Sequence, residues 1–293
     1  MPAPHLFPVV DSKDVFKDDI FKGKVLFCTG GGSGICKGMT EAVMHHGADA
    51  VIIGRNRDRL EQAAKDLSDA TRRRCLAAQA DVRDPQSLKD AVTMTIEAFG
   101  RIDFVICGAA GNFLAPISGL SENGFRTVIE IDTLGTYNTV KATLPHVRAS
   151  KGAYLHVTTT LHHRATPYQA HVSAAKAAVD ALSAVIAVEE GPHGVRSNVI
   201  APGATGGTTG MDRLWAPAHA NLSEIMKTFP GGRIAQFKDI ANATVFLLSG
   251  AASYITGQML VVDGGWESLR LPFLSYPESV LDPDAFKDPK PKL

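Results

Sequence analysis

The sequence has few cysteines and no excess of charge of either sign. Its 293 residues include four cysteines, with no C-x-x-C pair and no spacing typical of a metal site. We therefore expect free thiols and a reducing compartment rather than disulfides. Thirty basic residues balance thirty acidic ones, so net charge does not favour binding to nucleic acid or to an anionic membrane. Any anionic ligand must be held by local groups.

The sequence also lacks the usual signals for export and for membrane insertion. The N-terminal segment MPAPHLFPVVDSKD has no basic region followed by an apolar core, which predicts no secretory signal. No uninterrupted apolar run approaches the roughly 18 residues that span a bilayer, so we expect no membrane span. Residues 1–20 have no periodicity and predict an N-terminal arm.

From Lys24 onward, short apolar segments alternate with amphipathic ones. Such alternation predicts right-handed βαβ units and a parallel sheet that is covered on both faces. We expect an α/β fold with a Rossmann-type, doubly wound, seven-stranded parallel sheet. This single domain is expected over 21–270 and includes a substrate lid at about 204–230. A C-terminal tail is expected over 271–293. The predicted strands are 25–30, 50–54, 75–82, 103–110, 153–159, 195–203 and 258–265, and predicted helices include 58–70, 85–99 and 172–190.

The first predicted strand runs into a glycine-rich turn, TGGGSGIC, over 29–36. A glycine-rich turn between a first strand and a helix lets the backbone approach a pyrophosphate at the helix N-terminus. The alternative is a tight turn without a ligand, but its position at the first strand–helix junction favours a dinucleotide site. The candidate binding residues in this turn are Thr29, Gly30, Ser33, Gly34 and Ile35.

The end of the second predicted strand, Gly54-Arg55-Asn56, indicates the type of dinucleotide. An acidic residue here would accept a hydrogen bond from the ribose 2′-hydroxyl of NAD, whereas an arginine matches a 2′-phosphate. Arg55 and Asn56 therefore favour NADPH, unless Arg55 is a solvated surface residue. Asp81 and Val82, after the third strand, are candidates for contact with adenine, which we favour over the alternative that Asp81 is an ordinary strand-end cap.

Six ordered motifs over about 21–266 resemble the short-chain dehydrogenase/reductase family. The resemblance implies a nicotinamide dinucleotide held by the glycine turn and by residues after later strands. One departure is visible: the third glycine of the turn is replaced by Cys36, which is small enough to keep helix and strand packed. Besides the turn and Asp81-Val82, the matching residues are Ala109, Ala110, Gly111, Lys176, Pro202, Gly203 and the segment 262–265, and Thr205 is a further cofactor candidate.

The tyrosine that serves as the catalytic acid of that family is absent from this sequence. The family has this tyrosine four residues before the lysine, but here Val172 precedes Lys176, and valine cannot transfer a proton. The family's serine position falls at Thr159, and its asparagine position at Asp132. Two explanations remain open: the chain is a non-catalytic member, or its reaction needs no tyrosine acid.

The second explanation fits a subfamily. The segments 107–113, 131–132 and 171–176 resemble the peroxisomal 2,4-dienoyl-CoA reductases, which also lack the tyrosine and carry an aspartate on the helix. This resemblance implies NADPH-dependent reduction of 2,4-dienoyl-CoA to 3-enoyl-CoA, a step auxiliary to β-oxidation. It implies that Asp132 and Lys176 organise a proton relay oriented with Asn112. The substrate candidates are Asn112, Phe113, Thr159, Tyr168 and Thr208.

Two other functions stay open. The segment 206–210 lacks a glutamate common in that subfamily, so the substrate could be another conjugated thioester or a polyketide intermediate. A catalytically silent NADPH-binding protein is the alternative from a different class, and Val172 is its support. A retained Lys176 and Asp132 speak against it.

Several other residues need two interpretations. His162, His163 and His171 have no carboxylate at a recognised spacing, so we expect a polar active-site loop and no metal. Tyr168 either reaches the substrate or packs. Asn198 and Asp263 are expected to order the carboxyl edge of the sheet. Arg164, Arg213 and Lys227 are candidates for the CoA phosphates or solvated surface charges.

The last three residues, Pro291-Lys292-Leu293, resemble a Ser-Lys-Leu peroxisomal address. Together with the dienoyl-CoA resemblance they predict a peroxisomal enzyme recognised by the import receptor, with the cytoplasm as the alternative. We also expect a homo-oligomer, either a dimer or a tetramer.

Overall fold

The computed structural model describes residues 8–163, 165–208, 229–269 and 281–282. Seven parallel strands form one sheet in the order β3-β2-β1-β4-β5-β6-β7, which confirms the predicted fold class. Several predicted strands were too long at their carboxyl ends, because those residues belong to the loops that form the site. The strands are β1 (Val25–Thr29), β2 (Asp49–Gly54), β3 (Cys75–Gln79), β4 (Phe104–Cys107), β5 (Ala153–Val157), β6 (Arg196–Pro202) and β7 (Met259–Val262).

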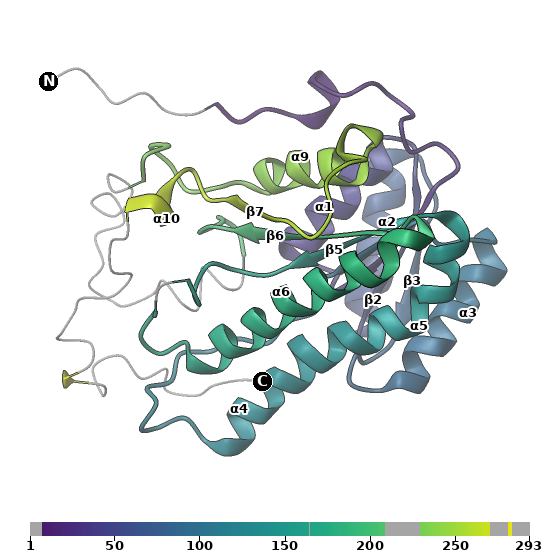
Figure 1. Cartoon of the computed structure of the whole chain (residues 1–293). Helices are drawn as coiled ribbons and strands as arrows, with labels where there is room; N and C mark the ends of the chain where they lie inside the picture. The colour runs from purple at the N-terminus through teal and green to yellow at the C-terminus, as the bar shows by residue number, and fades with distance from the viewer. Residues whose placement is uncertain (1–7, 164, 209–228, 270–280, 283–293) are drawn as a thin grey trace, which may run out of the picture.

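Helices cover both faces of the sheet (Figure 1). Successive strand residues point to opposite faces, so Leu26 and Cys28 lie in one core with α1, α2 and α9, whereas Phe27 lies in the other with α3 and α5. The first layer is α1 (Gly34–His45), α2 (Arg57–Thr71) and α9 (Phe237–Leu248); the second is α3 (Pro85–Phe99), α5 (Gly135–Ser150) and α6 (Ala170–Glu190). The short elements are η1 (Ser12–Asp14), α4 (Glu122–Val128), η2 (Ile129–Leu134), η3 (Gly191–His193), η4 (Gly250–Ala252) and α10 (Trp266–Leu269).

The sequence sets where the surface helices begin and end. The Asn56 side chain accepts a hydrogen bond from the Arg59 amide and caps α2, and Asp84 caps α3 ahead of Pro85. Each such cap contributes about 1 kcal/mol. Gly100 ends α3 with a φ of 77°, a conformation that glycine adopts without strain. The predicted bounds of α3 are confirmed.

One helical segment among the described residues, Ala170–His193, is long and apolar enough to cross a membrane by length and composition. It is not an uninterrupted apolar run, because Lys176 and Asp180 lie within it. The segment contains α6, which lies along the sheet in Figure 1 and buries polar side chains, Lys176 and Glu190 among them. Those contacts are typical of a core helix of a folded domain.

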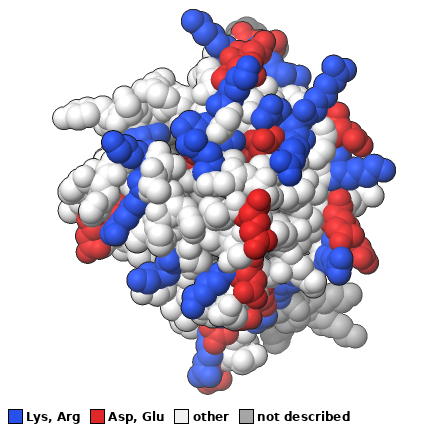
Figure 2. Space-filling model, turned by 90° about the vertical axis from the view of Figure 1, so that its right-hand side faces the viewer, with Lys and Arg blue, Asp and Glu red and all other residues white. Residues whose placement is uncertain are grey.

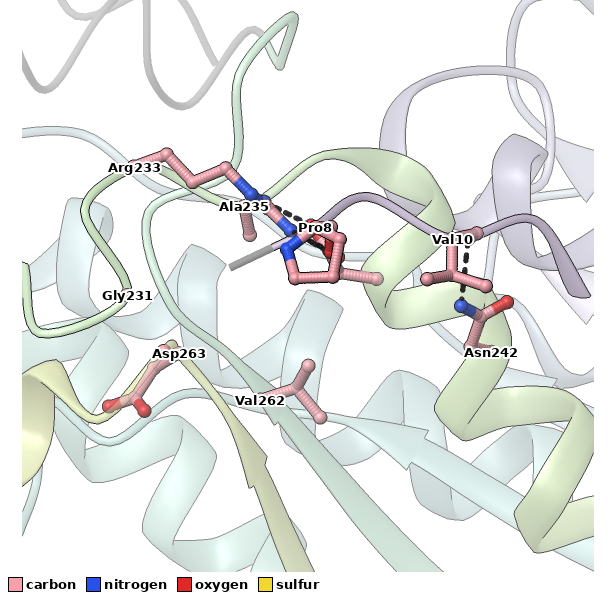
Figure 3. A pocket seen from close by; sticks show the side chains of 10 residues that line it. Pro8, Val10, Gly231, Arg233, Ala235, Asn242, Val262 and Asp263 are labelled. Atoms are coloured by element: carbon pink, nitrogen blue, oxygen red, sulfur yellow. Dashed lines mark hydrogen bonds and ion pairs between the residues drawn. The ribbon is translucent and has the colours of Figure 1, made fainter. Parts of the chain in front are cut away.

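The described part of the predicted N-terminal arm lies against α9 (Figure 3). The carbonyl of Pro8 accepts a hydrogen bond from Arg233 at 3.1 Å, and that of Val10 accepts one from Asn242 at 2.9 Å. Asp11 pairs with Lys238 at 2.8 Å. A hollow of about 280 Å³ lies beside these contacts. Residues far apart in the sequence are thus joined on this face.

The surface and the thiols agree with the composition. On the face shown in Figure 2, basic and acidic side chains are interspersed. All four cysteines, Cys28, Cys36, Cys75 and Cys107, are buried and free, as predicted. Burial raises the pKa of Cys75 to about 12, so this thiol stays protonated at neutral pH.

Candidate active site

A cavity of about 770 Å³ opens at the carboxyl ends of the strands. This is where ligands bind in open parallel sheets, near the point at which strand order reverses. Here the reversal lies between β1 and β4. Fifteen of the residues predicted from the sequence line the cavity: Gly30, Ser33, Gly34, Ile35, Arg55, Asn56, Asp81, Val82, Ala109, Ala110, Gly111, Asn112, Thr159, Lys176 and Thr208.

The glycine turn forms a cradle that fits a pyrophosphate. Gly30 has a φ of 74°, and a Cβ there would lie 2.8 Å from the carbonyl oxygen of Gly108. Gly34 has a φ of 58°, and a Cβ there would point into open space. Ser33 precedes α1, and its side chain makes no capping hydrogen bond. The first amides of α1 are therefore available to an anion, which the helix dipole favours.

Cys36 takes the place of the third glycine without blocking the cavity. Its thiol packs against Gly108, whose carbonyl oxygen lies 3.8 Å from Cys36 Sγ. A side chain at 108 would collide with this sulfur. The glycine after β4 thus provides the room that the cysteine in the turn requires.

Charged residues surround the ends of β2 and β3. Arg55 is exposed and lines the cavity, together with Arg59 of α2. Asp81 also lines it, but Arg83 donates to both of its carboxylate oxygens, at 2.6 Å and 3.1 Å, and lowers the pKa of that carboxyl. The carboxylate is thus already paired, and the role of Asp81 toward adenine stays a prediction.

Asp132 and Lys176 form a buried pair at the inner end of the cavity. Asp132 lies in the π-helical turn η2, is fully buried, and accepts a hydrogen bond from the Gly111 amide at 2.8 Å. Its other carboxylate oxygen lies 2.9 Å from Lys176 Nζ, which also donates to the carbonyl of Val157 at 3.0 Å. A π-helical turn is often found at functional sites. Lys176 lines the cavity and Asp132 lies behind it.

Beside this pair lie Val172, Asn112 and a buried histidine. Val172 lines the cavity where the family has tyrosine. The buried Asn112 Oδ1 accepts no hydrogen bond from the described residues. Phe113 does not line the cavity but is buried and stacks on His171, with ring centroids 4.2 Å apart. Burial lowers the pKa of His171, so its ring is neutral at pH 7. Among the described residues, the group of possible metal ligands that contains His162 and His163 does not include His171.

Four predicted cofactor residues do not line the cavity. The Thr29 hydroxyl accepts from the Gly108 amide at 3.1 Å and ties β1 to the loop after β4. Pro202 ends β6, and Gly203 packs against Asp263 so closely that a Cβ would lie 2.6 Å from Asp263 Cβ. Thr205 donates to the carbonyl of Gly203. Among the described residues, these positions shape the edge of the sheet rather than the cavity wall.

A second, apolar cavity of about 580 Å³ lies between the loop after β4, the loop after β5 and α6. Ala115, Leu161 and Tyr168 belong to its wall. Tyr168 is buried and has a φ of 66°, which is uncommon for a residue other than glycine. The sequence left Tyr168 between substrate contact and packing, and its position in this wall is compatible with both.

The structure corrects one of the two sheet-edge expectations. Asp263 accepts from the amides of Gly265 and Glu267 at 2.8 Å and 2.6 Å, and orders the carboxyl edge as predicted. Asn198 instead bonds the Ile255 carbonyl and the Gln258 amide, ahead of β7. It therefore ties the amino edge, because it lies near the start of β6.

Sequence reasoning missed several lining residues. Gly32 lay within the glycine turn, and Arg59 lies in the first turn of α2, close in sequence to Arg55, so both had a local signal. Ile131, Val157 and Thr158 are ordinary in sequence, and only the fold brings them to the cavity. Arg164, Arg213, Lys227 and the segment 291–293 lie outside the described residues.

Comparison with known proteins identifies the class. Residues 30–267 match the family described as enoyl-(acyl carrier protein) reductase. A short chain dehydrogenase from Bacillus anthracis superposes with a TM-score of 0.76 and 33% identity, covering 86% of this chain and 100% of its own. The chain belongs to the short-chain dehydrogenase/reductase family, whose members use a nicotinamide dinucleotide. The predicted resemblance is confirmed.

Two curated relatives within that family have the same activity in their names. The chain is 45% identical to the peroxisomal 2,4-dienoyl-CoA reductase, (3E)-enoyl-CoA-producing, of Saccharomyces cerevisiae over 91% of this chain and 92% of the relative. It is 44% identical to the enzyme of the same name from Danio rerio, over 86% of this chain and 84% of the relative.

Proposed function

We propose that this protein is an NADPH-dependent 2,4-dienoyl-CoA reductase that forms 3-enoyl-CoA. The observation that carries the proposal is the buried Asp132–Lys176 pair beside a dinucleotide cavity in which Val172 stands at the tyrosine position. The names of the relatives support the substrate and the product. A non-catalytic protein would have no use for a desolvated ion pair at this position, since such a pair adds little stability.

The residues at the inner end of the cavity fit the chemistry of a conjugated thioester. When bound, NADPH supplies a hydride. Reduction of a 2,4-dienoyl thioester at its remote carbon places negative charge on the thioester oxygen, which requires a hydrogen-bond donor rather than a tyrosine acid. A lysine ammonium has three N–H groups, and Asp132 and Val157 engage two of those of Lys176. The third is available to a ligand.

The second requirement is a proton for the α-carbon of the thioester. Asp132 holds Lys176 in place and, with Asn112, lies where a relay would pass. We assign proton delivery to the Asp132–Lys176 pair and orientation to Asn112. General acid–base assistance of this kind contributes about 10²–10⁴-fold to a rate.

Arg55 supports NADPH as the cofactor. Its exposed guanidinium lines the cavity at the end of β2. The residues at this strand end, Gly54-Arg55-Asn56, include no carboxylate that would repel a 2′-phosphate. Guanidinium geometry matches phosphate. Arg59 is a second candidate for the same phosphate.

The apolar cavity supports an acyl substrate. Its wall is formed mainly by alanine, proline, leucine and the Tyr168 ring, and Leu161 follows two residues after Thr159 of the dinucleotide cavity. An acyl chain that bound there would bury its apolar surface away from water, and few polar groups of the wall would lose hydrogen bonds to water. We assign Tyr168 to this wall.

Exposed apolar side chains support self-association. Leu134 and Tyr137, at the junction of η2 and α5, and Val185 and Val188 on α6, are 46–78% exposed. Exposed apolar side chains on neighbouring helices are typical of interaction surfaces when they come together in a patch. We infer a homo-oligomer built on these helices, and light scattering of the wild type and of a Val188→Glu variant would measure it.

The relatives also support a location. Their names place them in peroxisomes, and we propose the same compartment for this chain, with Pro291-Lys292-Leu293 read by the import receptor. A fluorescent fusion at the N-terminus should form puncta that disappear when Leu293 is removed. Unchanged diffuse fluorescence would favour the cytoplasm.

Activity is tested directly by following NADPH absorbance with 2,4-hexadienoyl-CoA and 2,4-decadienoyl-CoA. We expect turnover with a 3-enoyl product, identified by mass spectrometry and NMR, and no turnover with simple ketones. A conjugated thioester other than these as the sole substrate would favour the alternative reductase. NADPH binding without turnover of any thioester would favour the alternative that the chain is a catalytically silent NADPH-binding protein.

A further inference from the structure

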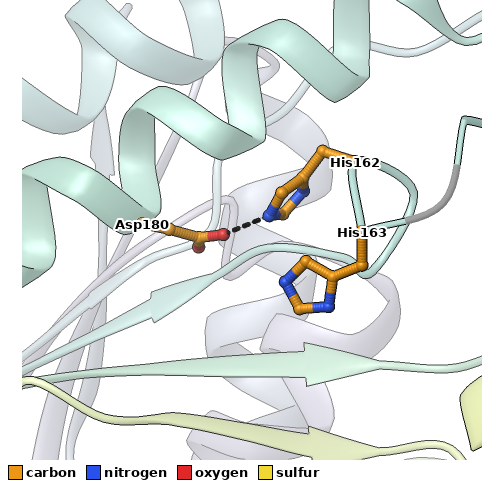
Figure 4. A group of neighbouring side chains, drawn as sticks. All are labelled: His162, His163 and Asp180. Atoms are coloured by element: carbon orange, nitrogen blue, oxygen red, sulfur yellow. Dashed lines mark ion pairs between the residues drawn. The ribbon is translucent and has the colours of Figure 1, made fainter.

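Three side chains that the proposed reaction does not use meet beside the active site (Figure 4). His162 and His163 lie on the turn after β5, and Asp180 lies on α6. Their ligand atoms all lie within 4.8 Å of one another. His162 Nε2 is 2.7 Å from Asp180 Oδ2, and the two imidazoles meet edge to face with centroids 4.5 Å apart. No carboxylate stands at a recognised spacing from these histidines in the sequence, because Asp180 reaches the pair only through the fold.

Backbone hydrogen bonds order the turn after β5 that carries His162 and His163, next to Asp180. The Leu161 amide donates to the Thr159 hydroxyl at 2.9 Å, and the His163 amide donates to the Thr160 carbonyl at 2.9 Å. His162 and Asp180 are 16% and 18% exposed, whereas the His163 ring is exposed and can adjust. Two of the three ligands are therefore fixed and the third is free to close.

The local charge favours a cation. The nearest lysine on α6, Lys176, is already paired with Asp132. The Glu267 carboxylate adds negative charge near His162. A largely buried carboxylate without a compensating cation is costly, and the groups that bond the Asp180 carboxylate here are the Thr158 hydroxyl and the His162 ring.

We propose that His162, His163 and Asp180 form a site for a divalent transition metal ion, with Zn²⁺ as the best fit. Two imidazole nitrogens and one carboxylate oxygen suit Zn²⁺, whereas Mg²⁺ and Ca²⁺ prefer oxygen ligands alone. Three protein ligands leave a fourth position open. The ion joins the turn after β5 to α6, and so fixes the wall formed by Thr159 on one cavity and His162 on the other. This proposal does not depend on the identity of the substrate.

The test uses the full-length protein without a histidine tag. Calorimetric titration with Zn²⁺ should give one ion per chain, and Co²⁺ should give the visible absorption of a four-coordinate site. His163→Gln and Asp180→Asn should each weaken Zn²⁺ binding by more than about tenfold, since the loss of even an outer partner costs 10–100-fold. The exposed His193 is on another part of the surface, so His193→Gln is the matched control and should bind as the wild type does.

Thermal unfolding provides the second readout. Zn²⁺ should raise the unfolding temperature of the wild type and of His193→Gln, because a ligand that binds the folded state stabilises it. It should not do so for His163→Gln, whose exposed position leaves the fold intact. Absence of Zn²⁺ binding to the wild type, or equal binding to the wild type and both ligand variants, would overturn the proposal.

Discussion

Two aspartates, one at each edge of the sheet, are almost completely buried and have very different surroundings. Asp103 directly precedes β4 at the amino edge, and its side chain is 1% exposed. It accepts hydrogen bonds from Lys24 at 3.0 Å, from Arg101 at 2.6 and 2.7 Å, and from the Val25 amide at 3.0 Å. Asp132, at the carboxyl edge, has one amide and one lysine. The first carboxylate is saturated, and the second is not.

The same contrast extends beyond the two carboxylates. Within the described chain, buried polar atoms without a hydrogen-bond partner include those of Asn112, Gln169, His171 and Ser173 on the carboxyl side, while Arg73, His156 and Asn242 hold such atoms elsewhere. Unsatisfied buried groups cost stability, and native proteins retain few of them. An edge that keeps several is built to bind something, whereas the amino edge is built to hold the sheet together. Each prediction below tests this division.

The largest effect is expected for Asp132→Asn. The amide keeps the size of the side chain and can still accept from Gly111, but it cannot carry a proton in the relay. We expect kcat with 2,4-dienoyl-CoA to fall by about 10²–10⁴-fold, with NADPH affinity nearly unchanged by fluorescence titration. Lys176→Ala should instead damage cofactor binding and turnover together.

These two variants also distinguish a catalytic role of the Asp132–Lys176 pair from a structural one. Combined, Asp132→Asn and Lys176→Ala should be non-additive, because residues that act as a unit share one effect. If Asp132→Asn keeps wild-type turnover while the protein melts earlier, Asp132 is structural and the two edges do not differ in the way described.

The matched change at the other edge is Asp103→Asn. Lys24 and Arg101 are 37% and 43% exposed, so water solvates them when the charge of Asp103 is removed, and the cost is that of weakened hydrogen bonds to a charged group, about 1.5–3 kcal/mol. We expect the free energy of unfolding, from urea denaturation, to fall by about that amount while kcat at 25 °C stays within twofold of wild type, where the folded fraction remains high. A large loss of kcat in folded Asp103→Asn would contradict the division between the edges.

Which edge is functional could be read from the sequence only in part. The strand–helix alternation and the glycine turn at 29–36 are local patterns, so the fold and the phosphate cradle followed from them. Lys176, Asp132 and Val172 were identified by resemblance to a family. The pairing of Asp180 with His162 depends on the way α6 lies beside the turn after β5, and no local pattern carries that. Thr29 was assigned to the cofactor because it flanks the turn, yet its side chain faces the loop after β4.

Arg55→Ala tests the outer part of the carboxyl edge. The guanidinium should contribute about 1.5–3 kcal/mol to binding of the 2′-phosphate, so the NADPH Michaelis constant should rise about ten- to a hundredfold. The NADH constant should hardly change, because NADH has no 2′-phosphate. Equal affinity of the wild type for the two cofactors would contradict the assignment, and Arg57→Ala, also exposed but not lining the cavity, is the control.

Low pH should reduce the free energy of unfolding through a buried histidine in the middle of the sheet. Burial lowers the pKa of His156 in β5 from 6.5 to about 3. The unfolded chain therefore takes up a proton below pH 6.5 while the folded one does not, and the stability present at pH 7 is lost as the pH falls toward 3. We expect a loss of about 2 kcal/mol between pH 7 and pH 5, at 1.36 kcal/mol per unit below 6.5. His156→Gln should flatten this part of the stability profile, and an unchanged profile would assign the effect to other groups.

The smallest effect concerns the position where the family has its acid. Val172 is 2% exposed and packs with Phe113, Val128 and Ala175. Restoring tyrosine there adds bulk to a packed wall, and the reaction proposed here has no ketone oxygen to protonate. Val172→Tyr should therefore not improve dienoyl-CoA reduction and should gain no ketone reduction. Val172→Phe has the same bulk without the hydroxyl, so the two variants should lose the same small amount of activity. A Val172→Tyr variant that turns over dienoyl-CoA clearly faster than Val172→Phe would show that the site can use a phenol after all. Robust ketone reduction by the wild type would remove the reason for assigning proton delivery to Asp132 and Lys176.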